Sequence, residues 1–370
     1  MPQQYYYIPI LKSKQGEYGS LHELHADVKD HMIPLLEVLP FDPIVKEQDE
    51  KVPPTLTEHL EKKLVKSILK KWEEARPFFL DFHLLQQIAN SLPSGVRPAQ
   101  FVLDLLREKN FKAVPVTSIN AHKDFQADVK QAVRRDGRGL MFRLQELDWY
   151  QDLDLVLGKQ VPSYFELRPN QIDLLIDMEF IEMSSVEDRI RQITDLINTK
   201  IPSITDWRSV TIGGTSVPKH MGGIKKNSDD TKIPRREWQI WHRLWDSRDN
   251  LRRVPTFCDY SILHPELSDI DPKVMNMSAQ IRYTLEDAIL VLKGESLIKS
   301  KSGYQQHHLL SRLLVEKDEY KGKEFSWGDS YIFKCARKEE TPGNRQTWRK
   351  IENCHHLTLV TEQLASFFAA

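Results

Sequence analysis

The chain has 370 residues, of which 40% are hydrophobic and 28% are charged, so a large buried core can coexist with a well-solvated surface. Lysine and arginine total 52 against 53 aspartate and glutamate residues, and this balance excludes a global electrostatic attraction to nucleic acid or anionic lipid. The three cysteines, Cys258, Cys335 and Cys354, are too widely spaced to suggest a disulfide framework or a thiolate zinc site.

The first two thirds of the chain repeat one pattern, in which a short apolar run is followed by a polar loop and a helical stretch. The predicted strands cover residues 6–11, 32–39, 77–83, 112–119, 140–144, 172–178, 210–212 and 255–260. The predicted helices cover residues 21–30, 55–75, 99–109, 124–135, 147–157, 185–199 and 235–247. Thr55 and Glu58 have the spacing of a capping box at the start of the second helix.

Eight short strands that alternate with helices favour a parallel sheet, and a count of eight permits closure. We therefore predict an α/β fold, a (β/α)8 TIM-like barrel with a C-terminal α+β appendage. The alternative is an open doubly wound sheet. Such a sheet would be expected to carry a GxGxxG fingerprint in its first turn, which this sequence lacks.

The seventh predicted strand opens into a loop with a candidate phosphate site. Its β-branched run ends in Gly213, Gly214, Thr215 and Ser216, and Pro218 blocks continuation of the strand. In eight-fold barrels the loops after strands seven and eight commonly hold phosphate, so these four residues are the predicted phosphate-binding loop. The alternative is an ordinary glycine turn. The polar stretch 219–232 (KHMGGIKKNSDDTK) is predicted to be a long, mobile loop.

The pattern changes after the eighth strand. Residues 279–284 and 288–292 predict a β-hairpin, residues 304–317 a helix, and further helices are expected to start at Asp329 and at about His356. We therefore predict a barrel domain over residues 1–275 and an appendage over residues 276–370 that packs on one end of the barrel.

Several stretches together resemble the Beta family proteins, which are barrel-like proteins of bacteria and phage-related mobile elements. They are PILKSKQGEYGSL, IPLLEVLP, GGTSVP and CDYSILHPE, followed by GD, WR and HH elements near the end of the chain. The resemblance covers nearly the whole chain. It implies a triosephosphate-isomerase-like barrel and a setting in phage defence, and it implies no reaction and no catalytic residues.

In a barrel, polar residues at the carboxyl ends of the strands converge on one mouth. The candidate catalytic residues there are Lys12, Glu17, Glu37, Asp81, Arg143, Asp177, Glu179 and Asp259, with His83 and Asn120 close by in the sequence. In one interpretation, Asp81, Asp177 and Glu179 hold a divalent cation such as magnesium or manganese, and Lys12 binds phosphate. In the other, Lys12 and Arg143 neutralise the carboxylates in a structural network.

The appendage contains cationic and aromatic residues that could stack on or neutralise a nucleotide or a nucleic acid strand. They are Arg337, Arg345, Trp348, Arg349, His355 and His356. In the alternative interpretation Trp348 is a core residue and His355 is its polar neighbour. The near-zero net charge favours this alternative.

The sequence predicts a soluble protein of a reducing cytoplasm. The N-terminal residues lack the basic start and the apolar run of a signal peptide, and no window approaches 18 consecutive apolar residues. We therefore expect neither export nor a membrane partner.

Two hypotheses about function follow from these patterns. The first is an enzyme that hydrolyses a phosphate-bearing substrate, a nucleotide or phosphodiester, with metal assistance at the mouth. The second is a catalytically inert recognition module that binds a phage or host protein. Carboxylates converging on an open cavity would support the first. Lys12 and Arg143 already paired to those carboxylates would support the second.

Overall fold

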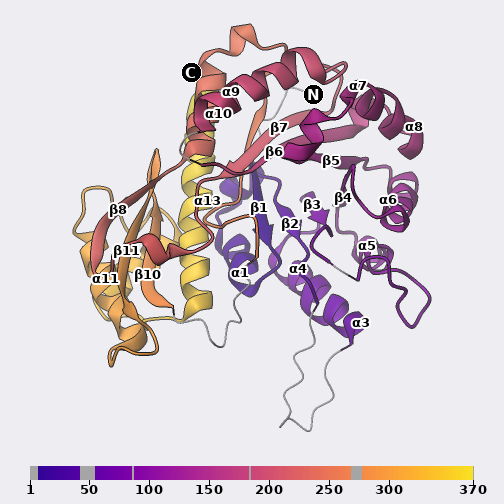
Figure 1. Ribbon diagram of the computed structural model, residues 1–370. Coiled ribbons are helices and arrows are strands. Elements are labelled where there is room, and N and C mark those ends of the chain that lie inside the picture. The colour runs from indigo at the N-terminus through magenta and orange to yellow at the C-terminus, as the bar shows by residue number, and fades with distance from the viewer. Residues whose placement is uncertain (1–6, 42–54, 86, 183–184, 268–276, 370) are drawn as a thin grey trace.

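The chain folds around a closed barrel of eight parallel strands in the computed structural model (Figure 1). The structure describes residues 7–41, 55–85, 87–182, 185–267 and 277–369. The barrel strands are β1 (Ile8–Lys12), β2 (Leu35–Glu37), β3 (Phe78–Asp81), β4 (Ala113–Ser118), β5 (Leu140–Leu144), β6 (Ile172–Phe180), β7 (Ser209–Thr215) and β9 (Thr256–Asp259). They follow one another around the barrel in sequence order, and β9 closes it against β1. The predicted TIM-like barrel is therefore confirmed.

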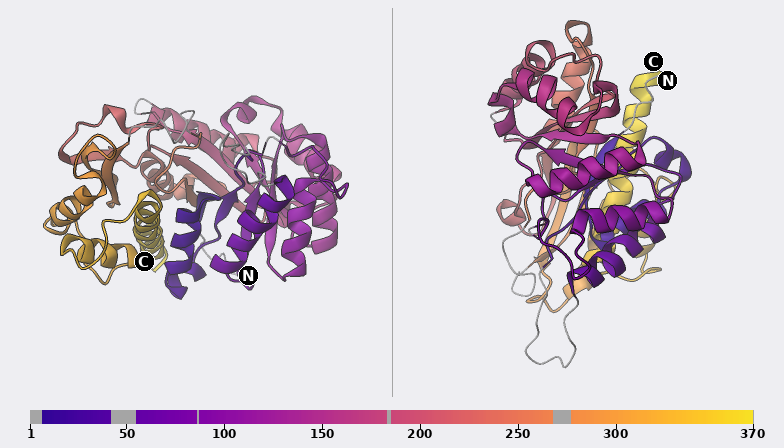
Figure 2. Two further views of the ribbon diagram at one scale, coloured as in Figure 1. Left: turned by 90° about the horizontal axis from the view of Figure 1, so that it is seen from below. Right: turned by 90° about the vertical axis from the view of Figure 1, so that its right-hand side faces the viewer.

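Helices surround the barrel as the alternating pattern predicts (Figure 2). They are α1 (Gln15–Glu23), α2 (Ala26–Asp30), α3 (Leu56–His59), α4 (Lys66–Lys71), α5 (Pro98–Glu108), α6 (Lys123–Asp136), α7 (Leu153–Leu155), α8 (Val161–Phe165), α9 (Val186–Asp195) and α10 (Arg236–Asp246). The capping box is confirmed, because Thr55 Oγ1 accepts from the Glu58 amide at 3.2 Å and Glu58 Oε2 accepts from the Thr55 amide at 3.1 Å.

Alternation along the strands explains which side chains reach the mouth. The barrel interior is filled by residues such as Ile10, Leu35, Phe79, Met141 and Leu175. Two positions later on the same strands, and so on the same face, come the mouth residues Lys12, Glu37, Asp81, Arg143 and Asp177. A charged layer therefore lies directly above an apolar layer inside the barrel.

The appendage is a three-stranded antiparallel sheet covered by helices. The predicted hairpin is confirmed as β10 (Ser278–Thr284) and β11 (Ala288–Ser296), followed by α11 (Gln306–Val315), α12 (Trp327–Ala336) and α13 (Arg345–Ala369). The sheet's third strand is β8 (Ser228–Pro234), which pairs with β11. The predicted long, mobile loop over 219–232 was therefore wrong for residues 228–232, which belong to β8. The division at residues 275 and 276 stays a prediction, because β8 joins the later segment from within the earlier one.

The long helix α13 packs against both the barrel and the appendage, and Figures 1 and 2 show it running between them. Leu357 and Val360 belong to the core on the barrel side, whereas Trp348 and Ile351 belong to the core of the appendage. The helix starts at Arg345, eleven residues before the predicted start at His356, so that prediction was wrong. Among the described residues, no helix has the length and apolar character needed to cross a membrane.

The close crossing of α12 and α13 generates the first prediction. Gly328 lies where a Cβ atom would collide with the backbone carbonyl of Ile351, which cannot move without shifting α13. We expect Gly328→Ala to lower the free energy of unfolding by about 1–3 kcal/mol, measured by urea unfolding. The control is Gly223→Ala, since nothing lies within 4 Å of a Cβ there. Equal stability of the two variants would contradict this packing.

Candidate functional site at the barrel mouth

Arg143 lies at the centre of the mouth and joins carboxylates from three other strands. Its Nη1 donates to Glu37 Oε1 at 3.0 Å and to Asp81 Oδ2 at 2.7 Å, and its Nε donates to Asp177 Oδ2 at 2.9 Å. Tyr260 completes the group, because its hydroxyl accepts from Arg143 Nη2 at 2.6 Å and donates to Asp177 Oδ2 at 2.6 Å. All five side chains are buried. We call them the Arg143 cluster.

His83 extends the cluster toward solvent. Its Nδ1 lies 3.1 Å from Asp81 Oδ2, its Nε2 lies 3.7 Å from Glu37 Oε1, and 32% of its side chain is exposed. Burial works to lower the pKa of His83, but the Asp81 carboxylate outweighs it and raises the pKa above its ordinary value. Burial likewise works to raise the pKa of Asp81, but His83 and Arg143 hold that pKa well below its ordinary value.

The structure therefore brings together four predicted site residues, Glu37, Asp81, Arg143 and Asp177, and places Glu179 beside them. The Glu179 amide donates to Asp177 Oδ1 at 2.9 Å, and its Oε1 accepts from Gln145 at 3.0 Å. Burial and the neighbouring Asp177 charge raise the pKa of Glu179. Glu37 keeps one buried oxygen, Oε2, without a hydrogen-bond partner.

Asp259 and Glu17 do not join the cluster. Successive side chains of a strand point to opposite faces, and Cys258 and Tyr260 point into the barrel, so Asp259 between them points outward. There Tyr7 donates to Asp259 Oδ1 at 2.5 Å, and His356 Nε2 lies 2.9 Å from Asp259 Oδ2. Glu17 is buried in α1, where its Oε1 lies 3.9 Å from Arg349 Nε. The expectation that these two carboxylates face the mouth cluster was wrong. Strand parity accounts for the placement of Asp259.

The predicted phosphate loop is packed inside the protein. Gly213 and Gly214 belong to β7, where a Cβ atom would meet Cys258 Sγ at 2.9 Å and Ile181 at 2.8 Å respectively. Thr215 Oγ1 accepts from the Val217 amide, and Ser216 Oγ donates to Glu237 Oε2 at 2.8 Å. These four residues shape the end of β7, and their role toward phosphate stays a prediction.

A basic pocket of about 450 Å³ lies between the mouth and the appendage. Its described lining contains seven lysine and arginine residues against one glutamate, and we use "basic pocket" for this hollow. The seven cations are Lys12, Lys14, Lys219, Arg282, Lys293, Arg345 and Arg349. The glutamate, Glu266, is paired with Lys219 at 2.7 Å.

The cations of the basic pocket fall into two groups. Lys293 and Arg282 are held by the protein, because Lys293 Nζ donates to two backbone carbonyls and Arg282 Nη2 donates to Glu352 Oε2 at 2.7 Å. The side chains of Lys14 and Arg345 have no hydrogen bond or ion pair to any described residue. Arg349 Nη1 is buried without a hydrogen-bond partner, although Arg349 Nε lies 3.9 Å from Glu17 Oε1. Lys12 donates to the Pro265 carbonyl, and burial lowers its pKa to about 8.

A second, smaller hollow of about 240 Å³ opens at the ends of β3, β4 and β5, and we call it the β3–β5 pocket. Polar groups on its lining come from His83, Thr117, Ser118, Asn120 and Gln145, with Asp81 and Arg143 at its floor. This pocket is therefore polar but, unlike the basic pocket, it has carboxylates beneath it.

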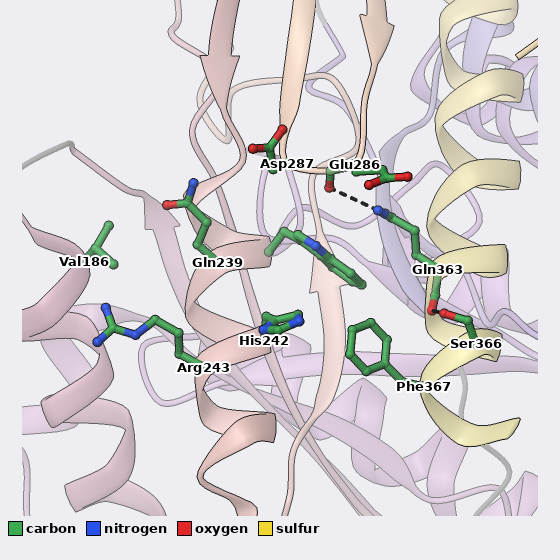
Figure 3. Close-up of a pocket in the computed structure, with 10 residues that line it drawn as sticks. Val186, Gln239, His242, Arg243, Glu286, Asp287, Gln363, Ser366 and Phe367 are labelled. Atoms are coloured by element: carbon green, nitrogen blue, oxygen red, sulfur yellow. Dashed lines mark hydrogen bonds between the residues drawn. The ribbon is translucent and has the colours of Figure 1, made fainter. Parts of the chain in front are cut away.

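A third hollow, of about 580 Å³, is shown in Figure 3 and lies away from the mouth residues. It is bounded by α10, the β10–β11 turn and the end of α13, where Gln363 donates to the Glu286 carbonyl at 3.0 Å. His242 and Phe367 form part of an aromatic contact across it. None of the predicted site residues lines it.

The predicted nucleic-acid residues of the appendage do not form one surface. Trp348 is buried and stacks on His307 at 4.5 Å, and His355 and His356 are buried as well. Arg337 pairs with Glu339 at 2.6 Å outside the basic pocket. Arg349 and Arg345 do line that pocket. Contact with a nucleotide stays a prediction, and the geometry supports it for these two arginines alone.

Metal binding at Asp81, Asp177 and Glu179 stays a prediction as well. Within the described residues, no group of three or more histidine, cysteine, aspartate or glutamate side chains is arranged to hold a metal ion. Arg143 and Tyr260 occupy the coordinating oxygen of Asp177, and Arg143 occupies that of Asp81. The carboxylate oxygens that a divalent ion would need here are therefore already bonded to Arg143 and Tyr260.

Several residues of these sites were missed from the sequence. Tyr260 could have been found, because it has the interior parity that Asp259 lacks. Arg282 and Lys293 could not, because their strands are remote from the mouth in sequence and reach it through the packing of the appendage.

A family model described as Beta protein matches residues 7–362. No curated protein matches the chain.

The Arg143 cluster generates the second prediction. Arg143→Met leaves three buried carboxylates without their cation, and we expect a loss of about 3–5 kcal/mol in the free energy of unfolding near neutral pH. In this variant the carboxylate pKa values of the folded state rise above those of the unfolded state. The loss is therefore full above the raised pKa values and shrinks as the pH falls through them. Urea unfolding at about pH 8 and about pH 5 measures this dependence.

A surface arginine supplies the control for this prediction. Arg191 pairs with the exposed Asp188, and Arg191→Met should change stability by no more than about 0.5 kcal/mol at either pH. A loss in Arg143→Met that is the same at both pH values would contradict the proposed cause.

Proposed function

The chain belongs to the Beta protein family, and we propose that it binds a phosphate-bearing ligand in the basic pocket. The observation that carries the proposal is the excess of cations: the side chains of Lys14 and Arg345 have no hydrogen bond or ion pair to a described residue, and Arg349 has, among the described residues, only the Glu17 carboxylate, at 3.9 Å. Burial lowers the pKa of Lys14, the Glu17 carboxylate works against this, and the like charges of Arg349 and Arg345 lower the pKa further. A folded protein that holds cations against their mutual repulsion is poised to bind an anion.

The positions of these cations support an anion with several charged oxygens. Arg345 and Arg349 are four residues apart on α13 and line the same pocket, while Lys12 and Lys14 come from the end of β1 and the loop that follows it. Burial lowers the pKa of Arg349 to about 10, and the nearby Arg282 charge adds to the effect. Guanidinium groups bind phosphate through paired N–H donors, so the pocket suits phosphate oxygens in particular.

The Arg143 cluster supports binding without metal-assisted hydrolysis. Arg143 already supplies the positive charge that a divalent cation would bring to Glu37, Asp81 and Asp177. This is the arrangement expected of a catalytically inert recognition module. We therefore propose recognition of a small phosphate-bearing ligand, a nucleotide or phosphodiester included. A setting in phage defence stays a prediction, because no lining residue distinguishes a phage ligand from a host ligand.

The third prediction tests anion binding. Pyrophosphate should raise the melting temperature of the wild-type protein, and at about 100 times its Kd the stabilisation should be about 2.7 kcal/mol. Arg345→Ala and Lys14→Ala should weaken this stabilisation while leaving the free protein as stable as the wild type or more so, because each removes a repelling charge. Differential scanning fluorimetry at several salt concentrations measures both effects.

Arg337→Ala is the matched control, because Arg337 is an exposed arginine of the appendage outside the basic pocket. It should respond to pyrophosphate as the wild type does. The proposal fails if pyrophosphate stabilises no variant, or if it stabilises Arg345→Ala as strongly as the wild type.

The fourth prediction separates binding from metal-assisted hydrolysis. We expect manganese to leave the melting temperature unchanged in the wild type and in Glu179→Ala, because Arg143 satisfies the carboxylates that a metal would need. A manganese-dependent rise in the wild type that Glu179→Ala abolishes would instead support a metal site at the mouth.

A further inference from the structure

Lys12 is a buried lysine that forms no ion pair with a described carboxylate. It is the last residue of β1, it lines the basic pocket, and only 3% of it is exposed. Its Nζ donates to the backbone carbonyl of Pro265, which carries no full negative charge. An ammonium group is costly to bury without a counter-ion, so this position favours the uncharged amine.

The charges around Lys12 have the same effect. Burial is the largest cause and lowers the pKa of Lys12 to about 8. The carboxylates of Glu37 and Glu17 oppose this change, whereas the cations Lys14 and Arg143 add to it. At pH 7 about one Lys12 side chain in ten is then uncharged, against fewer than about one in a thousand for an ordinary lysine. An uncharged amine is a nucleophile, and an ammonium group is not.

The pocket around this amine also contains the cations proposed to bind phosphate. Lys14 follows Lys12 by two residues, and the charges of Arg345 and Arg349 act on Lys14. All four side chains line the same hollow of about 450 Å³, a volume within the usual range for small-molecule sites. One small ligand can therefore contact the cations and the Lys12 amine without leaving this hollow.

We propose that Lys12 forms a reversible imine with a ligand that carries both a phosphate group and an aldehyde or ketone group. Lys14 and Arg345 contact the phosphate, and the carbonyl carbon meets the Lys12 amine. This inference rests on the proposed function and adds a covalent bond to it. Because water reverses the same step, the bond serves recognition and needs no turnover of the ligand.

Imine formation at Lys12 releases one molecule of water. The nitrogen donates its lone pair to the carbonyl carbon, and the carbonyl oxygen takes up a proton to give a carbinolamine. The carbon–oxygen bond then breaks, the oxygen leaves as water, and a carbon–nitrogen double bond takes its place. Both hydrogens of this water come from the amine, so the step requires no oxidant and no reductant.

His264 is the side chain best suited to move these protons. It lines the same pocket and precedes Pro265, whose carbonyl accepts from Lys12. Burial lowers the pKa of His264, the Glu266 carboxylate opposes this, and the Lys12 charge adds to it, so the ring is neutral near pH 7. Its Nδ1 accepts from the Glu266 amide at 3.1 Å, which leaves the ring proton on Nε2. A neutral imidazole can pass a proton from the nitrogen to the departing oxygen.

Reductive trapping tests the inference on the wild-type protein. Glyceraldehyde 3-phosphate is added with sodium cyanoborohydride, which reduces an imine to a stable secondary amine, and tandem mass spectrometry locates the adduct. At pH 7 Lys12 should be labelled at least about tenfold more than Lys62, an exposed lysine that pairs with Glu58, because more of the Lys12 amine is uncharged. Pyrophosphate should suppress the label on Lys12 and leave that on Lys62 unchanged.

Glyceraldehyde is the matched control ligand, because it has the carbonyl group and lacks the phosphate. At the same concentration it should label Lys12 at least about tenfold less, since a hydrogen bond to a charged group contributes about tenfold or more in affinity. Lys14→Ala should reduce this difference between the two ligands. Lys12→Arg keeps the positive charge but has no nucleophilic amine, so it should lose the adduct, and its melting temperature shows whether it folds.

The outcomes separate this inference from the proposed function. If pyrophosphate stabilises the protein but Lys12 is labelled no more than Lys62, or if the adduct lies on Lys14 instead, the imine inference is overturned and anion binding stands. Equal labelling of Lys12 by glyceraldehyde and glyceraldehyde 3-phosphate overturns it as well. If pyrophosphate fails to stabilise the protein and Lys12 gives no adduct, both proposals are overturned.

Discussion

One buried guanidinium group determines the chemistry of the barrel mouth. Arg143 contacts carboxylates from β2, β3 and β6, and each of these charges would be costly to bury alone. The cluster forms only when the strands close in the register that brings Glu37 next to Asp81, and Arg143 next to Leu175, two residues before Asp177 on the same face. Arg143 neutralises the carboxylates that closure of the barrel buries, and it thereby occupies the carboxylate oxygens that a divalent cation would need. Stability of the mouth and metal binding therefore compete for the same groups.

Sequence periodicity predicted the barrel because each barrel strand is an apolar run of its own. The positions of Glu37, Asp81, Arg143 and Asp177 at the ends of these strands then predicted that the four side chains meet at the mouth. The same prediction failed for Asp259, because Cys258 and Tyr260 take the interior positions of β9. The strand β8 has no local signal: its SDDTKIP sequence is polar and becomes a strand by pairing with β11. The start of α13 was missed because Trp348 and Ile351 face the appendage whereas Leu357 faces the barrel, so no single apolar face runs along the helix.

The orientation of α13 connects the appendage to the basic pocket. Two adjacent histidines point in different directions: His356 lies 2.9 Å from Asp259 of the barrel, and His355 lies 3.0 Å from Asp329 of the appendage. Consecutive residues on a helix are about 100° apart, so these two contacts fix the rotation of α13 about its axis. That rotation places Arg349, about two turns before the histidines, and Arg345, about three turns before them, at the edge of the mouth beside Lys14. Of the residues that suggested a nucleic-acid surface, His355 and His356 therefore hold α13 in place, whereas Arg345 and Arg349 line the basic pocket.

The Arg143 cluster and the rotation of α13 together keep the mouth carboxylates apart from the cations of the basic pocket. The mouth carboxylates cannot neutralise Arg345 and Arg349, because Arg143 holds them inside the barrel while α13 holds the arginines outside it. Elsewhere on the described surface many arginines have close carboxylate partners, as Arg134 has in Glu166. Places where a protein departs from its own local pattern at a cost in stability are expected to be functional. The excess of cations over carboxylates therefore makes the basic pocket, and not the more acidic cluster beneath it, the part of the mouth most directly suited to bind an anionic ligand.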